Sequence, residues 1–329
     1  MEQTYLGRSG LVVSELCLGT MTFGGKADLD ASRAMVERFR EAGGTFLDTA
    51  DVYTEGRSEE IVGEIVAGYR DEIVIATKAY GTTGPGPNDR SASRRHLVAA
   101  VDASLRRLGT DYIDVYQIHA FDPTTPLDET LETLEDLTRQ GKICYAGVSN
   151  FVGWQLERAC RIQQARGFSP LVSLQPQYSL IERQIELETL PAAMANNLGI
   201  LAWSPLAAGF LTGKYRRDGS SDDPGRFAQF VDNLAEHDWD TLDAVLEVAA
   251  AHGAQPATVA VRWLLEQPFV IPIIGATRLD QLDASLAAAD LELSPDERER
   301  LTKVSAPERG YPWDFGAVGG RPERELRSP

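Results

Sequence analysis

Four side chains that can hold or transfer protons follow consecutive apolar runs within the first 120 residues of this chain. Asp48 and Tyr53 come after one run, Lys78 after the next and His119 after the third. An ammonium within a few ångströms lowers the pKa of a phenol by roughly 1–3 units, and a carboxylate beside that ammonium keeps it charged. An imidazole nearby could orient a carbonyl oxygen through a hydrogen bond. Together these groups predict a site that protonates an oxygen as negative charge develops on it, with a bound hydride carrier as the electron source.

Each of these residues also has a simpler explanation. Asp48 could be the N-cap of the following helix, and Lys78 could be a surface amine. Tyr53 could be a packed ring, and His119 a loop histidine with satisfied hydrogen bonds. A shared site is favoured because parallel strands of a barrel bring their carboxyl ends to one face. A lyase that forms a Schiff base on Lys78 is the alternative from another enzyme class, but it leaves Tyr53 without a role.

The elements that must position these residues alternate along the chain. The predicted strands span residues 16–18, 45–47, 73–77, 113–118, 143–148, 171–174, 200–203 and 270–274. The predicted helices between and after them span residues 31–42, 58–67, 91–108, 127–140, 153–166, 187–197, 239–251 and 279–288. Eight strand and helix pairs in strict alternation predict an α/β fold, a parallel (β/α)₈ TIM barrel.

Segments outside this repeat are predicted to decorate the barrel. Turn residues 7–10 between apolar pairs predict an N-terminal β-hairpin, and residues 256–266 and 295–304 predict two extra helices. Loops rich in Gly, Pro, Ser and Asp at 81–89 and 218–226 are expected on the carboxyl-terminal end of the barrel. No domain boundary is evident, so residues 1–329 are predicted to form a single domain with an irregular tail at 305–329.

Two glycine-rich segments partly resemble phosphate-binding motifs of other folds. A doubly wound dinucleotide-binding sheet requires G-x-G-x-x-G after its first strand, and residues 19–24 lack that pattern. Residues 209–215 have three residues between the glycines, and Tyr215 stands where a magnesium-binding Ser or Thr is needed. The barrel therefore remains the favoured architecture.

Composition limits the partners of the protein. Its 329 residues carry a net charge of −17 and show no basic stripe, which argues against nucleic acid as a partner. The first residues lack the features of a signal peptide, and no apolar run is long enough to span a membrane, so a cytoplasmic protein is expected. Cys17, Cys144 and Cys160 are scattered, and we expect them to be buried free thiols. No metal site is predicted, and the oligomeric state is not indicated.

Two sequence blocks resemble the signatures of the aldo-keto reductase superfamily, most closely its bacterial general branch. The first covers residues 44–53 and 56–59, and the second covers residues 105–114 leading into His119. The resemblance extends over nearly the whole chain. It implies a catalytic tetrad of Asp48, Tyr53, Lys78 and His119, in which Tyr53 is the proton donor to an aldehyde or ketone reduced by NAD(P)H.

The resemblance also implies where the cofactor binds. Polar strand ends would hold the nicotinamide carboxamide, Trp203 would stack on its ring unless it is a core residue, and a loop of small residues with Lys214 would hold the pyrophosphate. The implied contacts are Gly19, Thr20, Met21, Asp48, Ser149, Asn150, Gln175, Trp203, Ser204, Pro205, Leu206, Gly209, Leu211, Gly213, Lys214, Gly275, Ala276, Thr277, Arg278 and Gln281.

Arg278 opens the last predicted helix and is the candidate for binding a 2′-phosphate, which favours NADPH; a surface role is the alternative. The chain departs from the family pattern at Ala284 and Ser285, where relatives commonly carry an acid and Asn for the adenine.

Substrate contacts are expected from variable loops. Phe23 and Phe121, with Tyr53 and His119, are the predicted lining, and the aromatic tail either joins them or covers the barrel without touching substrate. Such a lining suits a medium-sized aldehyde or ketone. The resemblance allows two alternative functions. One is an NADPH-binding regulatory or redox-sensing module like potassium-channel β-subunits, and the other is a nucleotide-deoxysugar reductase.

Overall fold

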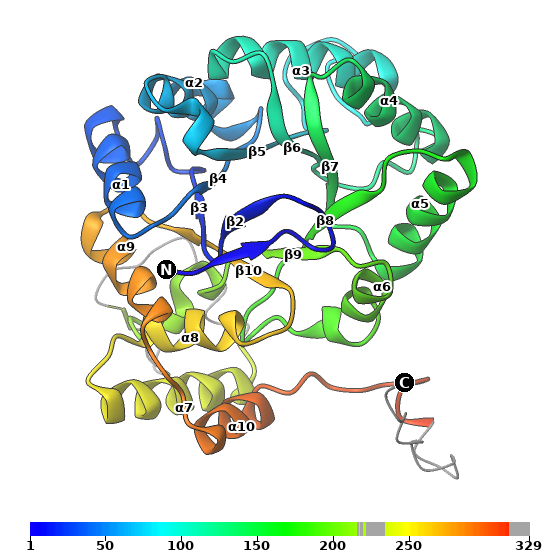
Figure 1. Ribbon diagram of the computed structural model, residues 1–329. Helices are drawn as coiled ribbons and strands as arrows, with labels where there is room; N and C mark the ends of the chain where they lie inside the picture. Colours follow the sequence, from blue (N-terminus) through cyan, green and yellow to red (C-terminus); the bar gives the residue numbers. More distant parts are fainter. Residues whose placement is uncertain (216, 218–219, 222–233, 316–329) are drawn as a thin grey trace.

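The protein is a closed barrel of parallel strands surrounded by helices (Figure 1). The computed structural model describes residues 1–215, 217, 220–221 and 234–315. The barrel strands are β3 (Cys17–Gly19), β4 (Phe46–Asp48), β5 (Val74–Ala79), β6 (Ile113–Ile118), β7 (Ile143–Ser149), β8 (Leu171–Gln175), β9 (Gly199–Ala202) and β10 (Val270–Gly275). They pair in sequence order, and β10 closes the barrel against β3. The prediction of a (β/α)₈ barrel is confirmed.

The helices follow the predicted alternation. Their bounds are α1 (Leu29–Glu41), α2 (Arg57–Val66), α3 (Arg94–Leu108), α4 (Leu127–Arg139), α5 (Gly153–Arg166), α6 (Thr189–Ala195), α7 (Glu236–His252), α8 (Pro256–Leu265), α9 (Leu279–Leu286) and α10 (Pro295–Val304). Local sequence sets several ends: Asp28 and Ser93 cap α1 and α3 with side-chain oxygens, and the left-handed Gly109 ends α3.

The N-terminal hairpin closes one end of the barrel. Its strands β1 (Gln3–Tyr5) and β2 (Val12–Ser14) pair antiparallel, as predicted. Leu6 and Val13 are fully buried and join inward-facing strand residues in one apolar cluster. Figure 1 shows the hairpin across the barrel opening nearest the viewer. The opposite opening, at the carboxyl ends of the strands, is therefore the end available for a site.

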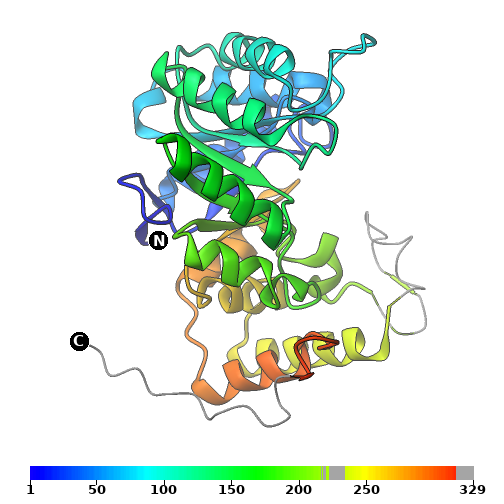
Figure 2. The same cartoon turned by 90° about the vertical axis from the view of Figure 1, so that its right-hand side faces the viewer.

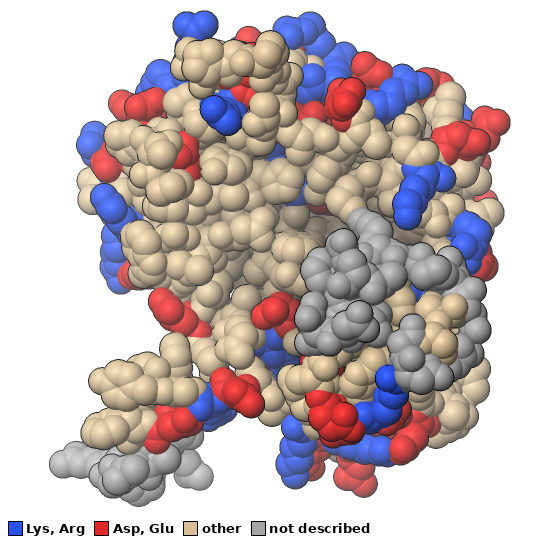
Figure 3. Space-filling model, turned by 180° about the vertical axis from the view of Figure 1, so that it is seen from behind, with Lys and Arg blue, Asp and Glu red and all other residues tan. Residues whose placement is uncertain are grey.

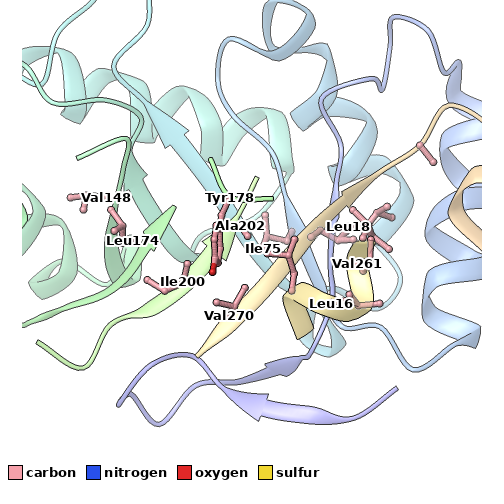
Figure 4. Packing of buried hydrophobic residues seen from close by; sticks show 14 of the residues in the cluster. Leu16, Leu18, Ile75, Val148, Leu174, Tyr178, Ile200, Ala202, Val261 and Val270 are labelled. Carbon is pink, nitrogen blue, oxygen red and sulfur yellow. The ribbon is translucent and has the colours of Figure 1, made fainter. Parts of the chain in front are cut away.

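Two apolar clusters divide the core because side chains of a strand alternate between its faces. The inner cluster fills the barrel with residues such as Phe46, Ala76 and Val115. The larger outer cluster packs the strands against the helices; Figure 4 shows Leu18 of β3 and Leu16, just before that strand, near Val261 of α8. This alternation assigns every strand residue to the barrel interior or to the helix layer.

The structure corrects which helix between β9 and β10 belongs to the barrel. The sequence assigned residues 239–251 to the ring and 256–266 to an extra helix. Instead, α8 packs on β10 and α9, whereas α7 packs on α8 and α10, outside the ring (Figure 2). The physical reason is that α8 is buried along most of its length, while α7 buries one face and exposes the other. The second extra helix, α10, is confirmed.

Smaller expectations differ at particular residues. Cys17 is buried, but Cys160 is half-buried and Cys144 is exposed, so the three thiols are free without all being buried. The loop at 81–89 is irregular, as expected. Most of the predicted loop at 218–226 lies outside the described residues.

The C-terminal tail is described as far as Phe315. Its rings at Tyr311 and Phe315 are exposed and touch each other, and the Trp313 indole donates a hydrogen bond of 2.9 Å to the Leu187 carbonyl. Residues 316–329 lie outside the described part of the chain. Among the described residues, no helix combines the length and apolar character needed to cross a membrane.

Candidate active site

Asp48 and Lys78 form a buried ion pair at the carboxyl ends of β4 and β5. The Lys78 Nζ donates to Asp48 Oδ2 at 2.6 Å and to the Thr49 carbonyl at 2.8 Å, and its side chain has no exposed surface. Burial is the largest single influence and lowers the pKa of Lys78. The interactions with Asp48 and Tyr53 together raise this pKa by more than burial lowers it, so the net pKa lies above its ordinary value. The amine is therefore held as a cation.

Tyr53 and His119 are the other two members of the predicted tetrad. The Lys78 Nζ donates to the Tyr53 hydroxyl at 3.3 Å, and the rings of Tyr53 and His119 meet edge to face with centroids 5.9 Å apart. Both residues are half-buried. The four predicted residues therefore lie together at the carboxyl end of the barrel.

Burial shifts the pKa values of Tyr53 and His119 in opposite directions. Burial, the largest influence, raises the pKa of Tyr53 above its ordinary value, and Lys78 only partly opposes this. The predicted net lowering of the Tyr53 pKa is thus corrected, because desolvation outweighs the nearby ammonium. Burial and the Lys78 charge lower the pKa of His119 to about 4, so its imidazole is neutral near pH 7.

A short left-handed turn fixes the direction of Tyr53. Thr54, Glu55 and Gly56 of the 3-10 turn η1 (Tyr53–Gly56) all have positive φ. The φ of +89° favours glycine at position 56, where an added Cβ would also lie 2.8 Å from the Cδ of Arg107. Ser58 then anchors the turn by hydrogen bonds of its hydroxyl to Thr20 and Thr49 at 2.9 Å.

Polar residues at the ends of neighbouring strands form a connected network around Asp48. Gln175 Nε2 donates to Asp48 Oδ1 at 2.8 Å. The Asn150 amide donates to the His119 carbonyl, and the Trp203 indole donates to Asn150 Oδ1, both at 3.0 Å. Ser149 belongs to the same network, because its hydroxyl donates to the Gln175 carbonyl at 2.8 Å and accepts from the Asn150 amide. The predicted nicotinamide residues are therefore adjacent to the tetrad.

The loop after β9 contains a run of left-handed backbone beside a lysine. Ser204, Ala207, Ala208 and Gly209 have positive φ, the last three within or at the start of η4 (Ala207–Thr212). A Cβ on Gly209 would meet the Lys214 side chain at 3.2 Å, so the cation lies against this turn. Small residues, left-handed backbone and a neighbouring ammonium suit a phosphate group. Pro205, Leu206, Leu211 and Gly213 belong to the same loop, with the Leu211 side chain buried.

The start of α9 is the second segment predicted to contact a phosphate group. The Thr277 amide and hydroxyl both donate to Gln281 Oε1, at 2.9 and 3.0 Å, which stabilises the first turn of the helix. Arg278 is exposed and donates to both carboxylate oxygens of Asp280, at 3.0 and 3.2 Å. Any anion that binds Arg278 must therefore compete with a carboxylate two residues away.

This helix start lies beside the loop that follows β3. The Thr22 hydroxyl donates to the Ala276 carbonyl at 2.8 Å, and Gly19 is paired with Gly275 in the barrel. The Thr20 hydroxyl donates to the Asp48 carbonyl at 3.0 Å. Gly19 and Thr20 thus connect the tetrad to the α9 terminus, while the Met21 side chain is exposed.

The predicted substrate residues do not all face outward. Phe23 has no exposed surface and packs in the outer core, which corrects its predicted contact with substrate. Phe121 is half-buried and meets Phe151 and Trp154 edge to face, with centroids 5.3 and 5.7 Å away. Trp154, which is 53% exposed at the first turn of α5, is not among the residues predicted from the sequence. Its position just after Ser149 and Asn150 was the available signal.

Gln117 is another residue beside Asp48 that is not among those predicted from the sequence. It is buried, and its Nε2 points toward Asp48 Oδ1 at 3.4 Å. Its place on β6, two residues before His119, could have indicated an inward side chain. Within the described ranges, no group of three His, Cys, Asp or Glu side chains is placed to hold a metal ion. Figure 3 shows the face opposite the hairpin, where charged residues gather mainly at the rim and uncharged ones fill much of the middle.

Comparisons with known proteins agree with this geometry. A family model described as the aldo/keto reductase family matches residues 15–306. An uncharacterized oxidoreductase, YrpG, of Bacillus subtilis is 39% identical over 92% of this chain and 96% of its own length. A probable voltage-gated potassium channel subunit beta of Oryza sativa is 36% identical over 94% and 98%. An aryl-alcohol dehydrogenase [NADP(+)] of Phanerodontia chrysosporium is 31% identical over 92% and 86%.

The family match covers most of the chain, and the relatives match nearly end to end. The family consists of NAD(P)H-dependent oxidoreductases that act on small carbonyl compounds. The chain belongs to the aldo/keto reductase family and is an NAD(P)H-dependent oxidoreductase.

Proposed function

We propose that the protein reduces an aldehyde or ketone to an alcohol with NADPH, and that Tyr53 donates the proton. The observation that carries the proposal is the placement of Lys78, whose buried Nζ bonds both Asp48 at 2.6 Å and the Tyr53 hydroxyl at 3.3 Å. A cation held beside the phenol, and itself paired with a carboxylate, stabilises the phenolate that remains after proton release and so opposes the burial that raises the Tyr53 pKa.

The residues divide the proton transfer among them. As negative charge develops on the carbonyl oxygen, the Tyr53 O–H bond breaks and its proton moves to that oxygen. The Lys78 ammonium stabilises the phenolate that forms, and Asp48 keeps Lys78 charged despite burial. His119, neutral because its pKa is lowered to about 4, can donate a hydrogen bond that orients the carbonyl oxygen.

The described residues fit a nicotinamide dinucleotide. Asn150, Ser149 and Gln175 present amide and hydroxyl groups beside the tetrad, and Trp203 lies next to Asn150. The left-handed turn with Lys214 and the α9 terminus offer two sites for phosphate groups. When bound, the cofactor supplies the hydride that reduces the carbonyl carbon.

NADPH is the proposed form because of Arg278. Its guanidinium stands at the start of α9, where a 2′-phosphate would find both a positive charge and backbone N–H groups. An enzyme that uses NADP(+) is among the relatives. We expect Arg278→Ala to weaken NADPH binding about tenfold and NADH binding much less. Equal losses for both cofactors in a fluorescence titration would contradict the assignment, and Arg298→Ala, on another exposed face, serves as the control.

The proposed substrates are aldehydes or ketones of medium size. Phe121 and Trp154 form an aromatic surface after the two strands that follow Lys78, and such a surface suits an apolar or aromatic carbonyl compound. The relative named an aryl-alcohol dehydrogenase is consistent with this class. A panel of aliphatic and aromatic aldehydes, followed by NADPH consumption, identifies the preferred class.

A regulatory role is the second candidate. The rice relative named as a potassium-channel β-subunit is 36% identical to this chain. A protein of that kind would bind NADPH tightly without turning over any carbonyl in the panel. Steady NADPH consumption with any of those carbonyls would exclude it.

Tyr53→Phe tests the proposed proton donor. This substitution removes one hydroxyl and keeps the ring that meets His119, so the fold and NADPH binding are expected to persist. We expect kcat to fall about 10²- to 10⁴-fold because the general acid is lost. Tyr112→Phe, a tyrosine far from the tetrad on the surface, is the matched control. Near-normal turnover in Tyr53→Phe would contradict the proposal.

A further inference from the structure

Asp51 is a buried carboxylate that the proposed mechanism does not use. It lies three residues after Asp48 and is 3% exposed. In the described part of the chain, no side chain donates a hydrogen bond to either of its carboxylate oxygens. Isolated buried carboxylates are costly when ionised, so this residue needs an explanation.

The groups around Asp51 come from two helices and two strands. Glu59 of α2 is fully buried, Arg107 comes from α3, and Thr77 and Tyr116 are paired neighbours on β5 and β6. The Tyr116 hydroxyl has no hydrogen-bond partner among the described residues. This outer cluster therefore holds two carboxylates and one guanidinium.

The guanidinium is already engaged by the other acid. Arg107 donates to Glu59 Oε2 through Nε at 2.7 Å and lies 2.6 Å from it through a second nitrogen. The Thr77 hydroxyl donates to Glu59 Oε1 at 2.5 Å. Burial first, and the Glu59 charge second, raise the pKa of Asp51 to about 7, although Arg107 partly opposes them. Protonation is the way in which Asp51 avoids an uncompensated charge.

Asp51 is also tied to the reactive groups on the inner face. Its backbone N–H donates to the Lys78 carbonyl at 3.1 Å, and Tyr53, two residues later, donates its own N–H to the Ala50 carbonyl at 3.1 Å. Burial raises the pKa of Tyr53 most and Lys78 lowers it, while the charge of Asp48 and, less strongly, that of an ionised Asp51 raise it. A negative charge at Asp51 therefore opposes formation of the Tyr53 phenolate.

We propose that Asp51 is a positioning residue that carries a proton in the active enzyme, and that loss of this proton places an uncompensated negative charge two residues from Tyr53 and slows carbonyl reduction. The inference rests on the proposed function, because it concerns the pH range in which that reaction runs. The pH dependence near neutrality then comes from Asp51 and not from His119, whose pKa of about 4 lies too low.

The kinetic test compares pH profiles of kcat for carbonyl reduction, from about pH 5 to about pH 9, in wild type and Asp51→Asn. We expect wild-type kcat to fall about three- to tenfold as the pH rises through about 7, because the charge of ionised Asp51 opposes formation of the Tyr53 phenolate. Asp51→Asn, which cannot ionise, should keep the low-pH rate throughout. A residue needed only for folding would lower the rate at every pH without removing the decline.

Two further variants sharpen the result. Glu59→Gln removes the neighbouring charge that raises the Asp51 pKa, so the midpoint of the decline should move to lower pH. Glu60→Gln, on the exposed side of the same helix, is the matched control and should leave the profile unchanged. A decline that persists at the same pH in both Asp51→Asn and Glu59→Gln would overturn the inference.

The proton itself can be observed without activity. Infrared difference spectra of the full-length protein between about pH 5 and about pH 9 should show a protonated carboxyl band that Asp51→Asn lacks. An identical band in the variant would overturn the inference even if Asp51→Asn were inactive. Failure of wild type to reduce any carbonyl at any pH would instead contradict the proposed function, so the two failures are distinguishable.

Discussion

Asp48 and Asp51 are two buried acids only three residues apart, but their carboxylates have opposite surroundings. Asp48 faces the barrel interior and accepts hydrogen bonds from Lys78, Gln175 and Gln117. Asp51 faces the helix layer and receives no hydrogen bond from any described side chain. The comparison teaches that burial alone does not set the charge of a carboxylate; the donors on its side of the sheet do.

The alternation of β5 explains the difference. Lys78 points into the barrel and forms an ion pair with Asp48. Thr77 points outward, and its hydroxyl donates a hydrogen bond to Glu59. One strand thus supplies a cation to one face and a neutral donor to the other. The cation on the outer face is Arg107, and it forms an ion pair with Glu59.

Removal of the inner cation is expected to have the largest effect. Lys78→Met leaves Asp48 buried without its cation, which should lower the free energy of unfolding by about 4 kcal/mol. The phenolate of Tyr53 also loses its stabilising charge, so kcat should fall about 10³-fold. Chemical denaturation and NADPH consumption measure the two effects.

Lys142→Met, which breaks the more exposed pair of Lys142 with Asp102, is the control for Lys78→Met and should cost under about 1 kcal/mol. If Lys78→Met were as stable and as active as this control, the inner pair would have neither the structural nor the catalytic role assigned to it.

The main features of the inner site could be predicted from the sequence. Strand ends are recognisable because an apolar run stops at a polar residue, and parallel topology then brings Asp48, Lys78 and His119 together. The barrel itself followed from strict alternation. These inferences depend on local patterns and on one general rule of topology.

The outer cluster could not be predicted in the same way. Its members come from a turn, two helices and two strands, and no spacing in the sequence indicates that Asp51, Glu59 and Arg107 meet. The assignment of α7 and α8 failed for a related reason: both segments have helical patterns, and only packing decides which one covers β10. Phe23 likewise has an aromatic side chain whose direction depends on tertiary packing.

The net pKa of Tyr53 shows a further limit. The sequence predicts the lysine that lowers this pKa, but the degree of burial, which raises it more, is a property of the folded chain. The direction of a pKa shift in a partly buried site therefore requires the structure, even where every ionisable neighbour is known.

Removal of the outer cation should have an intermediate effect. Arg107→Met leaves Glu59 buried and without its cation, and because Arg107 is itself partly exposed the loss of unfolding free energy should be about 2 kcal/mol. Activity should persist, since Arg107 does not contact the tetrad. Arg107 lowers the pKa of Asp51, so its loss should move the decline in kcat to higher pH. A loss of activity as large as that of Lys78→Met would erase the proposed distinction between the two faces.

Removal of one neutral donor from the outer acid should have the smallest effect. Thr77→Val keeps the size of the side chain and deletes the hydroxyl that donates to Glu59 at 2.5 Å, so unfolding free energy should fall by about 1.5 kcal/mol. Thr130→Val, which removes a buried hydroxyl bonded to the Ala92 carbonyl, is the matched control for the loss of a buried hydroxyl. A Thr77→Val variant as stable as wild type would mean that the hydroxyl does not stabilise Glu59, and the outer acid would then depend on Arg107 alone.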